Sequence, residues 1–335
     1  MAQEYQRILT EVFERYQSDL ETAMAGSLLP YCYQKGEDRE KGTFDKNYGR
    51  RQRLCYALLF FGKKHPGWTD EEYHDLVRRM FEQELMDRET NSFQGIGASL
   101  EILTQLLQAF DSPEDKPLFE RAKNANFDCG CGYVVQNYGY PDAPDVLSLE
   151  DGIYTMIDLQ ENDAARRLIA IWKENKGILC TDDYRTLSNW QKWLGDKGLE
   201  ADARRNELEN MLLEEEKNAW TICSACERLI RVLIEAGMWD EARERLMWIR
   251  QWLKPAREKW WDIGLGRFVL EDCMDLVLHG GGREKELWEW SHPFLLLAAG
   301  NMHGNLYRKA AEAARMMGDS KLGDEMDEGY RNLFR

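Results

Sequence analysis

The stretch Ala219–Pro255, which reads AWTICSACERLIRVLIEAGMWDEARERLMWIRQWLKP, predicts two helices folded back on one another. Apolar residues recur every three or four positions through 219–236, as they do on the buried face of a helix. The segment Gly237–Asp240 then joins a helix-ending glycine to a helix-starting aspartate. A second apolar stripe follows, and we expect Pro255 to end it because proline removes a helical hydrogen bond. A helical hairpin is an architecture rather than an active site, so this stretch predicts the fold of the chain and does not by itself predict its function.

The composition of the whole chain is that of a folded, helical protein. Hydrophobic residues make up 43% of the 335 residues and charged residues 31%, which is too much apolar material for a disordered chain. Alanine, leucine, glutamate and arginine fill the periodic segments, and there are only 8 prolines. We therefore expect an all-α fold made of stacked antiparallel helical hairpins.

Further pairs of segments repeat the pattern of an apolar stripe, a short turn and a second stripe. The predicted pairs are 149–159 with 164–173, 182–194 with 199–213, 256–279 with 284–299, and 305–317 with 321–334. A small residue marks the start of the second helix in several pairs, at Ala165, Ala201, Ala242 and Gly323. Repeats of this size are one hairpin each, and stacking them buries the apolar face of each neighbour.

The sequence divides into three segments that we expect to form one continuous array. Residues 1–127 are an N-terminal helical region, 128–146 an irregular connector, and 147–335 the helical-hairpin repeats. Thr69 and the three acidic residues after it predict a helix start inside the first segment. Residues 34–53 are expected to be a loop with a local excess of basic side chains. That loop either contacts phosphate or an acidic protein, or is simply mobile and solvated.

The segment Ile222–Lys254 resembles a tetratricopeptide repeat. Its turn at Gly237–Asp240 precedes a small residue, Ala242, at a place where two helices pack closely. Leu246 follows four residues later, and Pro255 stands near the end of the repeat. The resemblance to a degenerate tetratricopeptide-type α-solenoid covers the C-terminal half, and it implies a concave face that holds peptides, helices or whole proteins. A closed α/α toroid, in which paired helices ring a central cleft, is the alternative architecture.

The formal net charge of −16 comes from 60 acidic and 44 basic side chains. An acidic surface repels phosphate backbones, so we expect no general nucleic-acid binding, whereas a basic protein or peptide is a suitable partner. The most apolar run, Pro293–Gly300, is far shorter than the roughly 20 residues that span a bilayer. The first residues contain no apolar signal core. We therefore expect a cytoplasmic protein that does not insert in membranes and keeps its cysteines reduced.

Two cysteine pairs are candidate metal ligands. Cys129 with Cys131, and Cys223 with Cys226, have spacings at which a pair can supply half of a zinc site. Cys223 and Cys226, however, lie in a strongly helical stretch, where residues three apart share one buried face. We therefore favour cysteines packed in the core over a metal site. No phosphate-binding loop or other cofactor motif accompanies them, so no cofactor is predicted.

The last third of the chain holds the candidate partner-binding residues. Tryptophan is abundant, with 12 in the chain, and most are expected to fill helix interfaces. Tryptophan and arginine also contribute more to binding energy than their numbers suggest. Two histidines and an asparagine near helix ends either line a polar pocket or satisfy loose backbone groups. The candidates are Trp260, Trp261, Arg243, Arg250, His292, Asn301 and His303.

Two functions from different classes fit these features. The first is a non-enzymatic, protein-binding α-solenoid, and in particular an acidic immunity or inhibitor-type protein that occludes a basic partner. The second is an α/α-toroid enzyme, glycoside-hydrolase-like, with tryptophans and carboxylates lining its cleft. The acids that would act on a sugar in this second case are Asp262, Glu271, Asp272 and Glu289.

Overall fold

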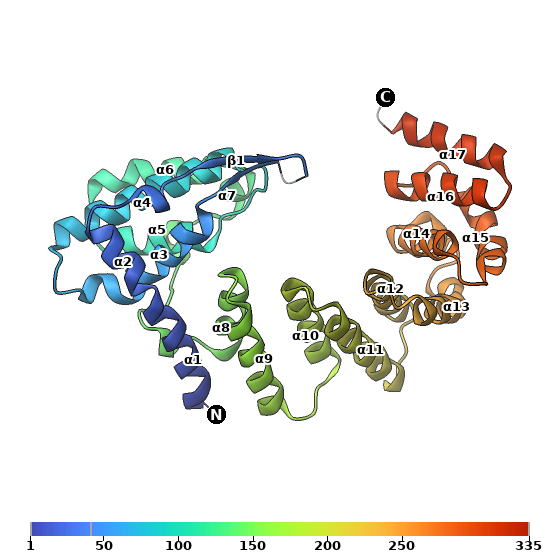
Figure 1. Cartoon of the computed structure of the whole chain (residues 1–335), viewed down its shortest axis with the longest axis horizontal. Coiled ribbons are helices and arrows are strands. Elements are labelled where there is room, and N and C mark those ends of the chain that lie inside the picture. Colours follow the sequence, from blue (N-terminus) through green and yellow to red (C-terminus); the bar gives the residue numbers. More distant parts are fainter. Residues whose placement is uncertain (1, 41, 334–335) are drawn as a thin grey trace. The chain divides into compact units, whose positions relative to one another are not determined.

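The computed structural model describes residues 2–40 and 42–333, and over these residues the regular secondary structure is helical apart from one short β-hairpin (Figure 1). The all-α prediction is therefore confirmed. Two compact units are present, an N-terminal unit, Met1–Lys176, and a C-terminal unit, Gly177–Arg335. Within the described ranges, no helix is long and apolar enough to cross a membrane. Lys41 in the expected basic loop and Phe334 in the last expected helix lie outside the described residues.

The N-terminal unit contains the helices α1 to α9 and the β-hairpin. Its elements are α1 (Ala2–Arg15), α2 (Gln17–Met24), β1 (Lys35–Asp38), β2 (Gly42–Asp45), α3 (Tyr48–Phe61), α4 (Asp70–Thr90), α5 (Ala98–Gln108), α6 (Lys116–Lys123), α7 (Phe127–Gly132), α8 (Leu149–Asp158) and α9 (Asn162–Lys176), with short 3₁₀ turns between them. The predicted start of α4 is confirmed, because Thr69 and Glu72 form a reciprocal capping box. The expected segment boundaries at 127/128 and 146/147 both fall within this unit, and the three-segment division stays a prediction.

Part of the expected basic loop, residues 34–53, is regular structure instead. Strands β1 and β2 pair in an antiparallel register that places Lys35 opposite Asp45, and α3 follows almost at once. The Asp45 side chain accepts hydrogen bonds from the backbone N–H groups of Gln34 and Asn47, both at 2.9 Å. The Asp45 carboxylate therefore connects the hairpin to the residue just before α3. The expectation of a loop was wrong here because local composition does not reveal such a contact.

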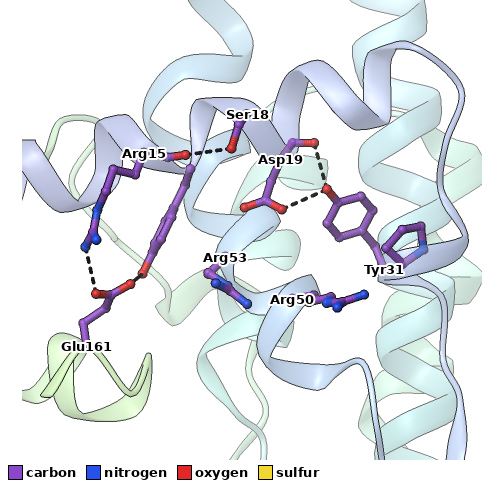
Figure 2. Close-up of a pocket in the computed structure, with 9 residues that line it drawn as sticks. Arg15, Ser18, Asp19, Tyr31, Arg50, Arg53 and Glu161 are labelled. Carbon is purple, nitrogen blue, oxygen red and sulfur yellow. Dashed lines mark hydrogen bonds and ion pairs between the residues drawn. The ribbon is translucent and has the colours of Figure 1, made fainter.

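Polar contacts tie the helical pair α8–α9 to the first helices of the chain. Glu161, which precedes α9, accepts hydrogen bonds from the Tyr16 hydroxyl and from Arg15, both at 2.8 Å (Figure 2). Gln52 of α3 donates a hydrogen bond to Asp158 at the end of α8. Contacts that bridge so many intervening residues fix α8 and α9 as part of the N-terminal unit.

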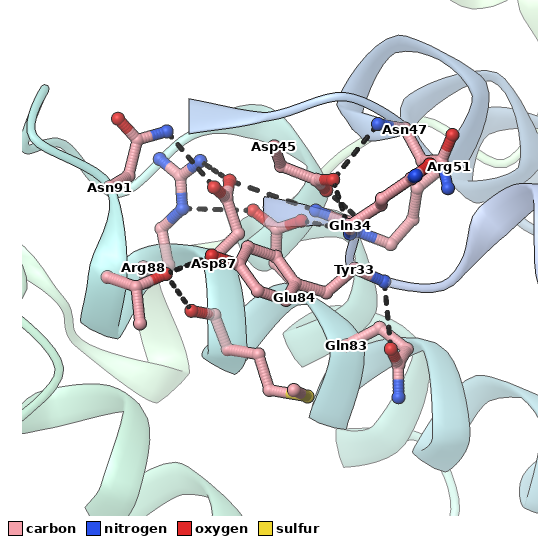
Figure 3. Close-up of polar contacts among 12 residues, drawn as sticks. Tyr33, Gln34, Asp45, Asn47, Arg51, Gln83, Glu84, Asp87, Arg88 and Asn91 are labelled. Atoms are coloured by element: carbon pink, nitrogen blue, oxygen red, sulfur yellow. Dashed lines mark hydrogen bonds and ion pairs between the residues drawn. The ribbon is translucent and has the colours of Figure 1, made fainter. Parts of the chain in front are cut away.

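A fully buried ionic network joins the hairpin, α3 and α4 (Figure 3). Arg51 donates to Asp45 at 2.5 Å and to Glu84 at 2.9 Å, and its remaining guanidinium nitrogen lies 3.7 Å from Asp87. None of these four side chains is exposed. Arg88 adds contacts to both Glu84 and Asp87. Charges removed from water are tolerated only when they are paired, so this network fixes which elements meet at the centre of the unit.

The C-terminal unit is a run of helices joined by short turns. Its elements are α10 (Thr181–Leu194), α11 (Lys197–Leu213), α12 (Ala219–Glu235), α13 (Trp239–Ala256), α14 (Gly264–His279), α15 (Glu284–Ala298), α16 (Gly304–Met316) and α17 (Ser320–Asn332). The hairpin predicted from Ala219–Pro255 is α12 with α13, and Gly237 between them has φ +73°, a conformation that glycine adopts readily. Pro255 lies within the last turn of α13, so the helix ends one residue later than expected.

Packing in the C-terminal unit runs between neighbouring helices. Helices α10 with α11, α12 with α13, α14 with α15 and α16 with α17 form pairs, while α14 also packs on α12 and α16 (Figure 1). One hydrophobic core extends from Ala201 in α11 to Met326 in α17. This arrangement is compatible with a helical solenoid, in which each hairpin buries the apolar face of the next.

Candidate functional site

Helices α12, α14 and α16 of the C-terminal unit carry a set of interacting charged residues, which we call the charged face. Its members are Glu227, Arg231, Phe268, Glu271, Asp272, Asp275, His303 and Lys309. The apolar stripes of the three helices point into the core, as Leu229, Leu270 and Leu306 illustrate, each with no exposed surface. The remaining sides of the helices are then left to polar residues.

Arg231 of α12 is the central cation of the charged face. It forms an ion pair with Glu227 one turn earlier, and its Nε lies 3.9 Å from an oxygen of Asp272 on α14. Its guanidinium carbon also lies 4.5 Å from the centre of the Phe268 ring, a cation–π contact. The Arg231 side chain is 41% exposed, so the guanidinium remains open to solvent although it has partners.

Lys309 of α16 is the second cation. Its ammonium group donates to Glu271 at 2.8 Å and to Asp275 at 2.7 Å, which bridges α16 and α14. His303, at the start of α16, lies 3.3 Å from the other oxygen of Glu271. Its ring also contacts Phe268, with 5.5 Å between the ring centres. The contacts of Lys309 and His303 therefore meet at Glu271.

Asp272 is the least usual member of the charged face. Its side chain is almost completely buried, and among the described residues its Oδ2 has no hydrogen-bond partner. Burial raises the pKa of Asp272 well above its ordinary value, and the nearby Glu227 carboxylate raises it further. Burial also raises the pKa of Glu227 and of Asp275, although Arg231 and Lys309 oppose the shifts. The charged face thus includes carboxyl groups that bind a proton more readily than usual.

His303 shows the opposite effect. Burial lowers the pKa of its imidazole, and this outweighs the attraction of Glu271. Its Nδ1 accepts a hydrogen bond from the backbone N–H of Leu306 at 3.4 Å, which caps α16. The neutral ring therefore carries its proton on Nε2, the nitrogen that faces Glu271. The members of the charged face include four carboxyl groups and two cations, Arg231 and Lys309. Neighbouring arginines also act on it, since Arg228 and Arg204 oppose the rise that burial causes in the pKa of Glu227, and Arg267 adds to the lowering of the pKa of His303 by burial.

The predicted tryptophan and arginine candidates fall elsewhere in the same unit. Trp260 is buried and stacks parallel to Trp290, with 5.7 Å between ring centres. The Arg250 guanidinium lies 5.0 Å from the centre of Trp290. Trp261 packs beside them against Phe294. These residues form an aromatic cluster in which Trp260 is a core residue and Arg250 is the more accessible member.

The other predicted candidates hold the ends of helices. Arg243 donates hydrogen bonds to Asp240 and to the carbonyl of Gly280. His292 contacts Asp319 at 3.3 Å. Asn301 donates to Asp262 and accepts from Arg267. Of the seven candidates, His303 alone belongs to the charged face, and the rest stay predictions as partner-binding residues.

The four candidate cysteines lie in different settings. Cys223 and Cys226 are buried in the hydrophobic core of the C-terminal unit. Cys129 is buried and Cys131 exposed in the N-terminal unit. Over residues 2–40 and 42–333, no cluster of three or more His, Cys, Asp or Glu side chains is arranged to hold a metal ion.

Sequence reasoning named Glu271, Asp272 and His303 but missed the residues that link them. Arg231 lies four residues after Glu227, a spacing that predicts an ion pair on a helix. On α14 the aromatic Phe268 and the acidic residues Glu271, Asp272 and Asp275 have the spacing i, i+3, i+4, i+7. That pattern was a signal in the sequence, since such spacing places all four residues on one side of a helix. Lys309 left no comparable signal, because its partners come from another helix.

A comparison with models of known protein families found no match to this chain, and a comparison with curated proteins found none either.

Proposed function

We propose that this chain is a non-enzymatic, tetratricopeptide-like α-solenoid that binds a basic protein in the cytoplasm, in the manner of an immunity or inhibitor protein. The observation that carries the proposal is the charged face on α12, α14 and α16. That face has more carboxyl groups than cations among its members and includes an exposed aromatic residue, Phe268, in a chain whose net charge is −16. The free thiols of the eight cysteines agree with a reducing compartment.

The charged face has the chemistry that recognises a basic partner. Phe268 is 39% exposed and lies beneath Arg231, so an incoming side chain can bury the ring without opening the core. Aromatic residues and arginine are enriched among the residues that dominate binding energy. A lysine or arginine of the partner can pair with Glu271 or Asp275, because in the free chain these two carboxylates share the single ammonium group of Lys309. The acidic chain would also accelerate encounters with such a partner.

A site-specific photocrosslinking experiment tests this proposal. A photoreactive amino acid is placed at position 268, and a matched control carries it at Leu297, which is exposed on α15. We expect the position-268 protein to crosslink a basic protein in extracts of the native source, and the control not to. The recovered protein should bind the purified chain less tightly as salt concentration rises. Equal crosslinking from both positions, or binding that does not respond to salt, would contradict the proposal.

The solenoid part of the proposal has its own test. A solenoid leaves its terminal hairpins apart, whereas the closed α/α toroid brings them together. Small-angle X-ray scattering of the full chain distinguishes an elongated particle from a compact ring. We expect the elongated particle, and a profile that fits a closed ring would favour the toroid.

One observation favours the enzyme as a second candidate. Burial shifts the pKa of Asp272 upward, its neighbour Glu271 contacts His303, and shifted pKa values cluster at catalytic sites. The other two candidate acids do not join them. Asp262 accepts hydrogen bonds from Asn301, and Glu289 pairs with Lys285 on the exposed side of α15. Hydrolysis of a panel of oligosaccharides that is lost in Glu271→Gln would establish this second candidate.

A further inference from the structure

A polar pocket of about 540 Å³ lies in the N-terminal unit, apart from the charged face (Figure 2). Its charged lining residues are Arg15, Asp19, Arg50, Arg53 and Glu161, and hydroxyl-bearing side chains, among them Ser18, complete its polar surface. The lining residues come from α1, α2, α3, the 3₁₀ turn between α2 and β1, and the turn before α9. The volume lies in the range of pockets that hold small molecules, roughly 300–1,000 Å³.

Both carboxylates of this pocket accept hydrogen bonds from neighbouring side chains, whereas two of its arginines form no ion pair among the described residues. Tyr31 donates to Asp19 at 2.9 Å, and Glu161 is held by Tyr16 and Arg15. Within the described part of the chain, neither Arg50 nor Arg53 has a carboxylate partner, although Arg53 bonds weakly to the backbone of its own helix. Arg50 and Arg53 are three residues apart on α3, a spacing that places two side chains on the same side of a helix, and both line the pocket (Figure 2). Two such arginines in one pocket are unusual in a chain of net charge −16, and the pocket sets three arginines against the two carboxylates of Asp19 and Glu161.

The position of these arginines in α3 increases their need for an anion. Arg50 lies in the first turn of α3, where the helix dipole is positive, and no acidic residue occupies that turn. Three arginines occur within four residues, at 50, 51 and 53, and the buried carboxylates neutralise Arg51 alone. The repulsion between Arg50 and Arg53 falls when a doubly charged oxyanion binds between them.

We propose that this pocket binds a phosphate monoester of a small hydroxylated molecule, with the phosphate held by Arg50 and Arg53. The planar fork of a guanidinium matches two oxygens of a phosphate, and two such forks match a dianion. Asp19, Glu161 and the Ser18 hydroxyl line the rest of the pocket and accept hydrogen bonds from hydroxyl groups of the ligand. This site is independent of the proposed protein-binding function.

Isothermal titration calorimetry of the full chain tests the assignment with three probes: ribose 5-phosphate, inorganic phosphate and ribose. We expect saturable binding of both phosphate compounds, tighter for ribose 5-phosphate, and none for ribose. The double variant Arg50→Gln, Arg53→Gln should lose roughly tenfold or more in affinity for either phosphate compound, because charge-assisted hydrogen bonds are removed. Asp19→Asn should weaken binding of ribose 5-phosphate more than that of inorganic phosphate.

Arg79→Gln is the matched control, since Arg79 is an exposed arginine of the same unit that pairs with Asp75 outside the pocket. It should bind both phosphate compounds as the unmodified chain does, and circular dichroism should show that all variants are folded. The proposal is overturned if neither phosphate compound binds, or if the control loses as much affinity as the double variant. Equal affinities for the two phosphate compounds would also overturn it, in favour of a site for free phosphate.

Discussion

Arg51 in the N-terminal unit and Arg231 in the C-terminal unit are both surrounded by carboxyl groups, yet their settings differ. Arg51 is completely buried and meets Asp45, Glu84 and Asp87. Arg231 is 41% exposed and meets Glu227 and the buried Asp272. Burial determines which role such a cluster has. A buried cluster fixes the fold, because no partner can reach it, whereas a half-exposed cluster can exchange an internal ion pair for one with a ligand.

The largest expected effect comes from breaking the buried cluster. Arg51→Met leaves the buried Asp45 without its cation and leaves Glu84 and Asp87 with Arg88 alone, and we expect a loss of about 3–5 kcal/mol in the free energy of unfolding. Hydrogen exchange of the full chain should show faster exchange in α3 and α4 and unchanged exchange in the C-terminal unit. Arg7→Met is the control, since Arg7 is exposed and pairs loosely with Glu11. If Arg51→Met has no more effect than the control, the cluster does not stabilise the fold.

The second-largest expected effect comes from changing the buried carboxyl group of the charged face, Asp272. Asp272→Asn keeps the shape of the side chain and removes its charge. We expect the free energy of unfolding at pH 7 to increase by about 1–3 kcal/mol, which is the usual cost of a buried polar group without a hydrogen-bond partner. The folded-state pKa of Asp272 is raised, so the wild-type chain loses stability as pH rises from the ordinary aspartate pKa through that higher value. The gain should therefore shrink as pH falls towards about 4.

Thermal unfolding between pH 4 and pH 8 measures this difference, with Glu289→Gln as the control for loss of an exposed carboxylate. The control should change little at any pH. If Asp272→Asn instead destabilises the chain equally across this range, then Asp272 is ionised and its pairing with Arg231 is stabilising.

The smallest expected effect concerns the exposed side of the same face. Lys309→Met removes the ammonium group shared by Glu271 and Asp275, and we expect a cost of about 1 kcal/mol or less because partly exposed ion pairs contribute little. The pKa of His303 should rise, since the Lys309 charge helps to hold it down. NMR titration of the imidazole measures that shift, and Lys321→Met, at an exposed lysine of α17, should leave it unchanged. A fall in the His303 pKa would contradict this account of the face.

Much of the helical framework could be predicted from the sequence because helix signals are local. The stripe in Ala219–Pro255, the glycine at 237 and the capping residues at Thr69 and Glu72 act over a few residues, and each element formed nearly where it was expected. The hairpin β1–β2 was missed because Asp45 closes it through contacts that composition does not show. The charged face was found only in part, since Lys309 meets its partners across two helices.

Arg50 and Arg51 show what the sequence determines by itself and what only the tertiary structure decides. They are neighbours of the same residue type in α3, and the sequence determined that both belong to an acidic, all-α protein but placed them in a predicted loop. Only the tertiary structure decided that Arg51 is enclosed by three carboxylates while Arg50 lines an open pocket. The physical reason is that helix formation depends on neighbours along the chain, whereas the environment of a charge depends on segments that packing brings together from distant parts of the sequence.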